Sequence, residues 1–415
     1  MLNIKSSYLY DNNDPFFWLG DTAWLLFGRL KREEIIKYLD NRASLGFNVI
    51  QAILLFPSDS RNVRDYNDES YFDFVNEILL YAEELGIYFA LLPCWGSSIK
   101  NNLINEDNYE EIINRITNKF KNNKNIIWVL GGDIRGDYNI DLFNKMGKLI
   151  KKNNPDKLIT FHPFGRLGSY LWFNDEDWLD FNMYQSGHRR YDQLDLPWDP
   201  DSLDEATFGE DAYRYVYKAK TYANFKPIID GEPSYEGVVQ GLHDSTQPYW
   251  QDYDVRRYAY YGIFAGASGF TYGHGAIIQF YTEGKGEYGV KTKWQDALDA
   301  PGAKELIHLK RLMKSIDYTK GTNDDSLILN QGFKHDHKVV FKGLDYILIY
   351  NYLGNDTIIN LNDYKDKEMA IWLMNPINGI LTHLGSIRGL NKITLMPPKR
   401  EDVLNDWVII LKELK

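Results

Sequence analysis

The chain contains 415 residues, 44% of them hydrophobic and 25% charged, so it is long enough for two or three domains and has the composition of a folded globular protein. Lysine and arginine total 47 against 58 aspartates and glutamates, and the net charge of −11 disfavours binding to nucleic acid or to an anionic membrane surface. The sequence has a single cysteine, Cys94, which excludes an internal disulfide and a cysteine-rich zinc site and suits a reducing compartment.

The N-terminal segment, residues 1–10, lacks a basic stretch followed by a long apolar run. We therefore expect no signal peptide and a cytoplasmic protein. The longest apolar stretch, Ile87–Pro93, is far shorter than the roughly 18 residues that indicate a membrane-spanning helix. The sequence thus predicts no membrane partner, and it leaves the oligomeric state open.

Eight short apolar or β-branched runs recur along the first two thirds of the chain, and most of them precede a segment with helical periodicity. Eight strands that alternate with helices favour a TIM-type (β/α)₈ barrel over an open doubly wound sheet. No glycine-rich phosphate-binding motif follows the first strand, which also disfavours the open sheet. The predicted strands are Phe17–Gly20, Asn48–Leu54, Ile87–Leu92, Asn125–Leu130, Lys157–Phe161, Asp180–Met183, Pro227–Ile229 and Gly269–Tyr272.

Stripes of apolar residues predict helices between the strands. Glycine readily adopts the left-handed conformation that ends a helix, so Gly46 and Gly86 mark two helix ends directly before strands. A final barrel helix is expected over Ala303–Ile316. The clearest stripe, whose spacing would place it on one helix face, comprises Phe74, Ile78, Tyr81, Ala82 and Leu85, and a second comprises Leu142, Met146, Leu149 and Ile150.

The pattern changes after the last predicted helix to short strands joined by Asn, Asp and Gly turns, which is typical of a small antiparallel β-sandwich. We place the boundary near Thr319–Asp324, giving a barrel domain of residues 1–320 and a β-domain of residues 321–415. No Pro/Ser-rich linker separates the two, so we expect them to pack together. The predicted strands are Leu327–Leu329, Lys338–Phe341, Tyr346–Tyr350, Thr357–Leu361, Met369–Met374, Ile380–His383, Lys392–Leu395 and Trp407–Leu411.

Polar and aromatic side chains follow the predicted barrel strands. The C-terminal ends of barrel strands converge on one mouth, where active sites form. Carboxylates, amides and imidazoles can bind hydroxyl groups, and an aromatic face can pack against a sugar ring, so the pattern predicts an oligosaccharide ligand. The candidates at the mouth, in strand order, are Asp21, Trp24, Gln51, Trp95, Asp133, His162, Tyr184, Gln185, His188, Glu232, Tyr235 and His274.

Two of these carboxylates are candidates for catalysis. Asp133 follows the fourth predicted strand and two glycines that let the backbone turn sharply, and Glu232 follows the seventh strand, where Pro233 favours an extended conformation. Glycoside hydrolysis needs such a pair, one as proton donor and the other as nucleophile or base. Burial and the proximity of Glu232 should raise the pKa of Asp133 and keep it protonated near neutral pH.

Several candidates have a second interpretation. Asp21 is equally placed to cap the first helix or to form a hydrogen bond inside the barrel, and Trp24 and Trp95 also fit the core. The histidines at the mouth lack H-x-H or H-E-x-x-H spacing, so we expect neither a metal nor another cofactor. Two rival classes remain open, a non-catalytic carbohydrate-binding barrel and a metal-dependent barrel hydrolase.

The chain resembles the apiosidase-like glycoside hydrolases, family 140. The resemblance implies a (β/α)₈ catalytic domain, followed by a β-domain of the kind often described as collagen-binding. It also implies that Asp133 is the general acid/base and Glu232 the nucleophile of a retaining glycosidase without cofactor, which releases apiose or a similar terminal sugar from plant cell-wall oligosaccharides. Family members commonly have Arg directly after the aspartate, whereas here Ile134 precedes Arg135. The matching segments are FFWLGDTAW (16–24), GFNVIQA (46–52), LLPCWG (91–96), IIWVLGGD (126–133), DFNMYQSGH (180–188), DGEPSYE (230–236) and FTYGHG (270–275).

Overall fold

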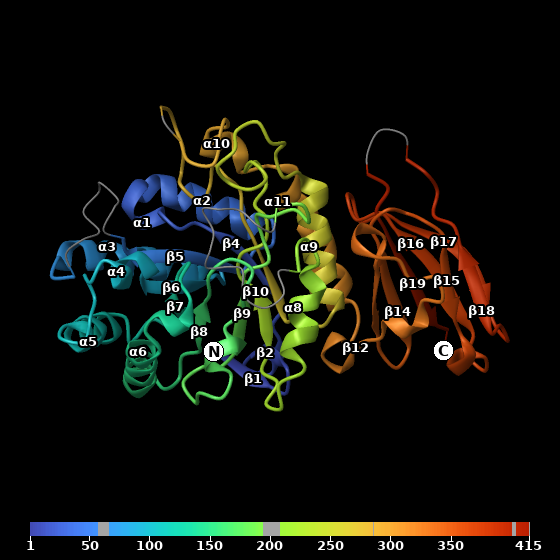
Figure 1. Ribbon diagram of the computed structural model, residues 1–415, viewed down its shortest axis with the longest axis horizontal. Coiled ribbons are helices and arrows are strands. Elements are labelled where there is room, and N and C mark those ends of the chain that lie inside the picture. Colours follow the sequence, from blue (N-terminus) through green and yellow to red (C-terminus); the bar gives the residue numbers. More distant parts are fainter. Residues whose placement is uncertain (57–65, 194–207, 285, 401–403, 415) are drawn as a thin grey trace.

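The structure is a computed structural model that describes residues 1–56, 66–193, 208–284, 286–400 and 404–414. A barrel of parallel strands surrounded by helices is followed by an antiparallel β-domain that packs against one side of it (Figure 1). The fold class expected from the sequence is therefore confirmed. Among the described residues, no helix has both the length and the apolar character that crossing a membrane requires.

The barrel sheet contains eight parallel strands in the order β8-β7-β6-β5-β4-β11-β10-β9. Hydrogen bonds from the Asp180 amide to the Ile159 carbonyl and from the Thr160 hydroxyl to the Phe181 carbonyl join β8 to the residues directly before β9, which brings the two ends of the sheet together. All the strands lie close to the predicted runs, because a parallel sheet covered on both faces needs continuous apolar stretches. The strands are β4 (Trp18–Thr22), β5 (Val49–Leu55), β6 (Tyr88–Cys94), β7 (Ile126–Gly131), β8 (Ile159–His162), β9 (Asn182–Tyr184), β10 (Ile228–Asp230) and β11 (Gly269–Tyr272).

The helices around the barrel turn the predicted stripes inward: in α3, Ile78 and Ala82 are buried, and Phe74 and Tyr81 are half-buried beside them. Gly46 and Gly86 have φ of 86° and 71°, the left-handed conformation expected where a helix gives way to a strand. The helices are α1 (Leu26–Arg29), α2 (Arg32–Ser44), α3 (Glu69–Glu84), α4 (Gly96–Lys100), α5 (Tyr109–Lys119), α6 (Ile140–Asn153), α7 (Tyr170–Phe173), α8 (Ala212–Ala219), α9 (Asp252–Phe264), α10 (Trp294–Ala297) and α11 (Pro301–Lys314).

A small antiparallel sheet that the sequence did not predict precedes the barrel. It consists of β1 (Leu2–Lys5), β2 (Tyr8–Asp11) and β3 (Asp14–Pro15). Leu9 is fully buried, and the Ser268 hydroxyl, next to the start of β11, donates to the Ser7 carbonyl at 2.7 Å. This sheet therefore covers the end of the barrel opposite the mouth.

The β-domain has a six-stranded antiparallel sheet, in the order β12-β13-β14-β19-β16-β17, and a two-stranded sheet, β15-β18. Ile347 and Ile409 from the larger sheet and Ile359 and Leu395 from the smaller one share an apolar cluster, which makes the sandwich. The predicted strand Leu327–Leu329 is wrong: a 3₁₀ turn covers Asp325–Leu327, and Ile328 forms only an isolated bridge to Ile359. The strands are β12 (Thr322–Asn323), β13 (Lys338–Lys342), β14 (Tyr346–Asn351), β15 (Thr357–Asn360), β16 (Met369–Met374), β17 (Leu381–Ile387), β18 (Lys392–Leu395) and β19 (Trp407–Glu413).

The β-domain packs closely against the barrel, as expected from the missing linker. The rings of Tyr260 on α9 and Tyr350 on β14 stack with centroids 4.7 Å apart. Arg256, also on α9, is buried, and its Nε lies 2.8 Å from a carboxylate oxygen of Asp406. A buried ion pair that loses one partner leaves an uncompensated charge, so this interface resists separation.

Candidate active site

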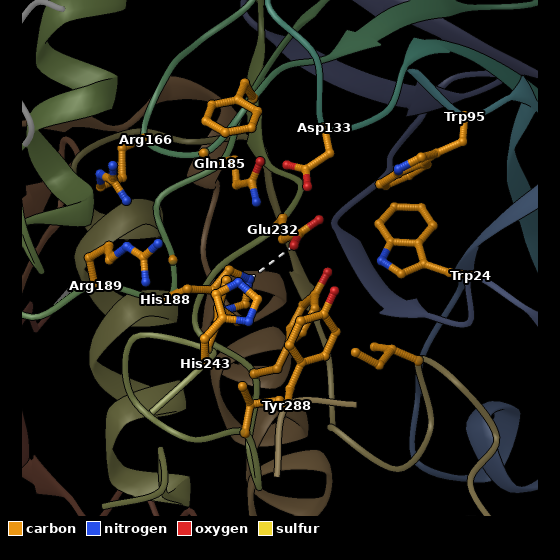
Figure 2. A pocket seen from close by; sticks show the side chains of 17 residues that line it. Trp24, Trp95, Asp133, Arg166, Gln185, His188, Arg189, Glu232, His243 and Tyr288 are labelled. Carbon is orange, nitrogen blue, oxygen red and sulfur yellow. Dashed lines mark hydrogen bonds and ion pairs between the residues drawn. The ribbon is translucent and has the colours of Figure 1, made fainter. Parts of the chain in front are cut away.

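A cavity of about 290 Å³ opens at the C-terminal ends of the barrel strands. Asp133 and Glu232 both line it, and Figure 2 shows their carboxyl groups pointing toward one another. They follow β7 and β10, the fourth and seventh barrel strands in chain order. The cavity wall comprises Trp24, Trp95, Asp133, Phe164, Gly165, Arg166, Gln185, Gly187, His188, Arg189, Glu232, Tyr235, Val238, Leu242, His243, Ile278 and Tyr288.

Three successive residues in the left-handed backbone conformation direct the Asp133 side chain into this pocket. Gly131, Gly132 and Asp133 have φ of 85°, 94° and 53°. A Cβ on Gly132 would lie 2.5 Å from the Trp95 ring, and one on Gly131 would lie 2.4 Å from the His162 carbonyl oxygen. Both glycines are therefore needed for the chain to turn beneath its neighbours and present the aspartate.

Two imidazoles hold the carboxylate of Glu232. Its Oε1 lies 2.9 Å from Nε2 of His188, and its Oε2 lies 3.1 Å from Nε2 of His162. Burial alone would favour the neutral acid, but hydrogen bonds from His162 and His188 outweigh it and lower the pKa of Glu232 to about 2. Glu232 is therefore ionised over almost the whole accessible pH range.

The environment of Asp133 raises the pKa of its carboxyl group, whereas that of Glu232 lowers it. Burial, followed by the negative charge of Glu232, raises the pKa of Asp133 to about 6, as predicted from the sequence. The backbone amide of Asp133 approaches Nδ1 of His162 at 3.5 Å, so the His162 ring lies between the backbone of Asp133 and the carboxylate of Glu232. Two neighbouring carboxyl groups with pKa values displaced in opposite directions are the mark of an acid and an anion that act together.

Aromatic residues form the wall beside the carboxylates. The Trp24 and Trp95 rings meet edge to face with centroids 5.0 Å apart. Burial and the charge of Glu232 raise the pKa of the Tyr235 hydroxyl well above its ordinary value, so this hydroxyl keeps its proton beside the carboxylate. The structure thus brings these candidates from the sequence together around the cavity: Trp24, Trp95, Asp133, Gln185, His188, Glu232 and Tyr235.

Within the described chain, the cavity wall does not include the remaining candidates, Asp21, Gln51, His162, Tyr184 and His274. Gln51 is buried inside β5, and its amide donates to the Gly231 carbonyl at 2.8 Å, directly before Glu232. Tyr184 stacks on Tyr215 in the core. Successive side chains of a strand point to opposite faces, so nearness to a strand end does not by itself place a side chain in the mouth.

His162 contacts Glu232 from outside the wall, and His274 and Asp21 hold local structure. Nδ1 of His274 accepts a hydrogen bond from the Ala276 amide at 3.0 Å. Burial, and then the charge of Arg42, lowers the pKa of His274 to about 4, so it is neutral at physiological pH. Asp21 is fully buried, 2.6 Å from Nε of Arg42, and also accepts from the Tyr38 hydroxyl at 2.6 Å. The structure thus favours the internal interpretation of Asp21.

Replacing Asp21 with asparagine should lower the free energy of unfolding by about 3–5 kcal/mol, because Arg42 would keep a buried charge without its partner. Chemical denaturation measures this loss. Glu77→Gln is the control, since Glu77 pairs with Arg32 at the surface and its removal should leave the midpoint nearly unchanged. Equal midpoints for the two variants would contradict the structural role of Asp21.

Several pocket residues escaped the sequence analysis because they lie in loops beyond the strand ends. Arg166 and Tyr288 have φ of 63° and 57°, so the loops hold both in a conformation uncommon for residues other than glycine. The arginines of the pocket wall are Arg166 and Arg189. Arg135 instead pairs with Asp137 at 2.8 Å. The sequence signal that could have identified Arg166 and Arg189 is that both arginines lie in the loops after the fifth and sixth barrel strands.

The described residues contain no group of three or more His, Cys, Asp or Glu side chains placed to hold a metal ion. Cys94 lies buried at the end of β6, and burial raises the pKa of its thiol to about 12. A thiol that keeps its proton is a poor nucleophile.

Comparison with known proteins agrees with this geometry. The model of the family "Apiosidase-like, catalytic domain" matches residues 4–320, and that of the "Putative collagen-binding domain of a collagenase" matches residues 323–412. A solved structure named "Glycoside hydrolase" is 35% identical, covers 99% of this chain and 96% of its own, and has a TM-score of 0.92. A glycoside hydrolase family 5 structure from Bacteroides vulgatus ATCC 8482 is also 35% identical, with coverage of 99% and 93% and a TM-score of 0.91. A search of curated proteins found no match. The chain therefore belongs to the apiosidase-like family and is a glycoside hydrolase built on a (β/α)₈ barrel.

Proposed function

We propose that this glycoside hydrolase removes a terminal sugar, apiose or a similar one, from plant cell-wall-type oligosaccharides with retention of configuration. The observation that carries the proposal is the pair of facing carboxyl groups with pKa values of about 6 for Asp133 and about 2 for Glu232. Retention requires a protonated acid and an ionised nucleophile at the same pH. Between these two values both groups are in the required state.

In the proposed reaction, a carboxylate oxygen of Glu232 bonds to the anomeric carbon while the bond from that carbon to the leaving oxygen breaks. Asp133 gives its proton to the leaving oxygen. Water then attacks the same carbon, transfers a proton to Asp133 and displaces Glu232, which restores both carboxyl groups. His162 and His188 keep the nucleophile charged and oriented before the first step.

The size of the pocket supports a small terminal sugar rather than the interior of a polymer. Its volume of about 290 Å³ is just below the usual range for small-molecule sites, which is about 300–1,000 Å³. Trp24 and Trp95 offer apolar ring surface beside the carboxylates, where a sugar ring can pack. Membership of the apiosidase-like family supports apiose as the first sugar to test.

A screen against aryl glycosides and pectic oligosaccharides tests the proposal, with NMR of the first-formed sugar to establish its anomeric configuration. We expect release of one terminal sugar with the configuration of the substrate. Tight sugar binding without turnover would favour a carbohydrate-binding barrel, and loss of activity with a chelator would favour a metal-dependent hydrolase. An inverted product would contradict the nucleophilic role of Glu232.

His162→Asn should move the acid limb of the kcat/KM profile to higher pH. The limb reports protonation of Glu232, and with one donor fewer, burial raises the pKa of this carboxyl from about 2. His274→Asn is the control, because the ring nitrogen of His274 accepts from the Ala276 amide instead. An unmoved acid limb in His162→Asn would show that His162 does not hold Glu232 in its ionised form.

A further inference from the structure

The loop that follows β9 connects the pocket wall to the β-domain. Its first part contributes Gln185, His188 and Arg189 to the wall, and Tyr191 comes two residues after Arg189. The described chain resumes at Phe208 and leads into α8. Figure 1 shows α8 and α9 on the side of the barrel that faces the β-domain. A short turn of that domain, Lys334–His337, meets the loop at this place.

Tyr191 is held from both sides. On the side of the β-domain, its ring lies 5.2 Å from the ring of His335 and 4.9 Å from Nζ of Lys334. On the barrel side it packs on Gly209, where a Cβ would lie only 2.6 Å from the Tyr191 ring. The Tyr191 hydroxyl also donates to Asp211. The ring is therefore fixed between the two domains.

Glu210 gives the same turn an ionic anchor. One of its carboxylate oxygens lies 2.9 Å from Nε2 of His335 and 2.6 Å from Nη2 of Arg257. Burial opposes ionisation, but Arg257 and His335 outweigh it and lower the pKa of Glu210. Glu210 and Arg257 are both buried, so this ion pair is shielded from solvent, whereas the His335 side chain is 37% exposed.

The turn is itself held firmly by the barrel. The Tyr261 hydroxyl, on α9, lies 3.3 Å from the Lys334 carbonyl and 3.0 Å from the His337 carbonyl. The His337 ring stacks on Tyr213 of α8 with centroids 4.1 Å apart and the planes 14° from parallel. Because the turn is fixed at both ends, it can restrain the loop that packs on it.

The pocket needs such support at His188. Its φ of 76° is uncommon for a residue other than glycine, and such a conformation persists only where the surroundings hold it. His188 donates its amide to the Ser234 hydroxyl and accepts from the Gly241 amide, both at 2.8 Å. These bonds hold His188 itself, and the contacts of Tyr191 with the β-domain hold the chain three residues further on.

We propose that the turn Lys334–His337 of the β-domain is a positioning element of the active site, which holds Tyr191 and Glu210 and thereby keeps His188 against Glu232. The inference rests on the proposed role of Glu232 as nucleophile. It gives the β-domain a function in the hydrolysis itself, without requiring it to bind a second ligand.

His335→Ala in the full chain tests the inference. We expect kcat to fall about 10-fold to 100-fold, as when a catalytic group is slightly misplaced, and the acid limb of kcat/KM to move to higher pH as Glu232 loses its histidine. His335→Gln, whose amide can still donate to Glu210, should restore most of the activity. Tyr350→Phe is the control, because it removes a hydrogen bond within the β-domain to Asp406, the residue that pairs with Arg256 of the barrel, and should lower only the melting temperature.

A His335→Ala variant with the pH profile and kcat of Tyr350→Phe would overturn the positioning role. If His335→Ala does not fold, Tyr191→Ala carries the test, since it removes the ring that the turn holds. Glu232→Gln is measured in parallel. Full activity of the Glu232→Gln variant would refute the proposed function. If Glu232→Gln is inactive but His335→Ala has wild-type kcat and the wild-type pH profile, the positioning role alone is refuted.

Discussion

Replacing Glu232 with glutamine should lower kcat/KM on an activated aryl glycoside by about four orders of magnitude, equivalent to about 5.5 kcal/mol of transition-state stabilisation. The amide has nearly the same shape as the carboxylate but cannot form the glycosyl-enzyme bond. His162 and His188 would then face a neutral group in place of the anion they hold at 3.1 and 2.9 Å. Steady-state kinetics with an aryl glycoside measures the loss.

Glu236→Gln provides the matched control for this variant. Glu236 is also buried, but its carboxylate accepts from the Tyr272 hydroxyl at 2.6 Å and from the Gly302 amide at 3.1 Å, so it ties the loop after β10 to the start of α11. We expect Glu236→Gln to lower the melting temperature and to keep kcat/KM near the wild-type value. Near-wild-type turnover by Glu232→Gln would show that Glu232 is not the nucleophile.

Replacing Asp133 with asparagine should abolish the basic limb of the pH profile. The wild-type carboxyl donates a proton, so kcat/KM falls as the pH rises through its pKa of about 6, where it becomes ionised. Asparagine has no proton to lose in this range. The rate should fall about 10²-fold to 10⁴-fold on substrates with poor leaving groups and less on activated aryl glycosides, which need little protonation.

Asp137→Asn is the control for the general acid, because Asp137 lies on the same loop and pairs with Arg135 at 2.8 Å. Its loss should leave both limbs of the profile in place. A basic limb that persists near pH 6 in Asp133→Asn would mean that another group titrates there. Equal loss on good and poor leaving groups would show that Asp133 does not donate the proton.

The barrel could be predicted almost completely from the sequence, because its signals are local. Buried parallel strands require continuous apolar runs such as Val49–Leu55, and glycines such as Gly86 mark the ends of helices. The N-terminal sheet was missed because its strands are very short, and the strand expected at Leu327–Leu329 is a turn that makes a single bridge. Short apolar segments do not distinguish strand from turn until their partners are known.

Only some residues of the candidate site could be predicted from the sequence. Asp133 and Glu232 could be identified because glycines or a proline fix the backbone beside them, so their directions depend on local conformation. Gln51 and Tyr184 were assigned to the mouth, yet they point into the barrel and the core, since successive side chains of a strand point to opposite faces. Arg166 was missed because its loop brings it to the pocket from beyond the strand end.

The sequence by itself determined the order of the barrel strands, the presence of a β-domain and the two carboxylates that follow the fourth and seventh strands. Only the tertiary structure decided their protonation, because a pKa depends on burial and on neighbours that come from other strands. His162 and His188 converge on Glu232 from β8 and the loop after β9, and Glu232 in turn raises the pKa of Asp133. The contact of Tyr191 with His335 likewise joins residues far apart in the chain, and local sequence patterns carry no signal for it.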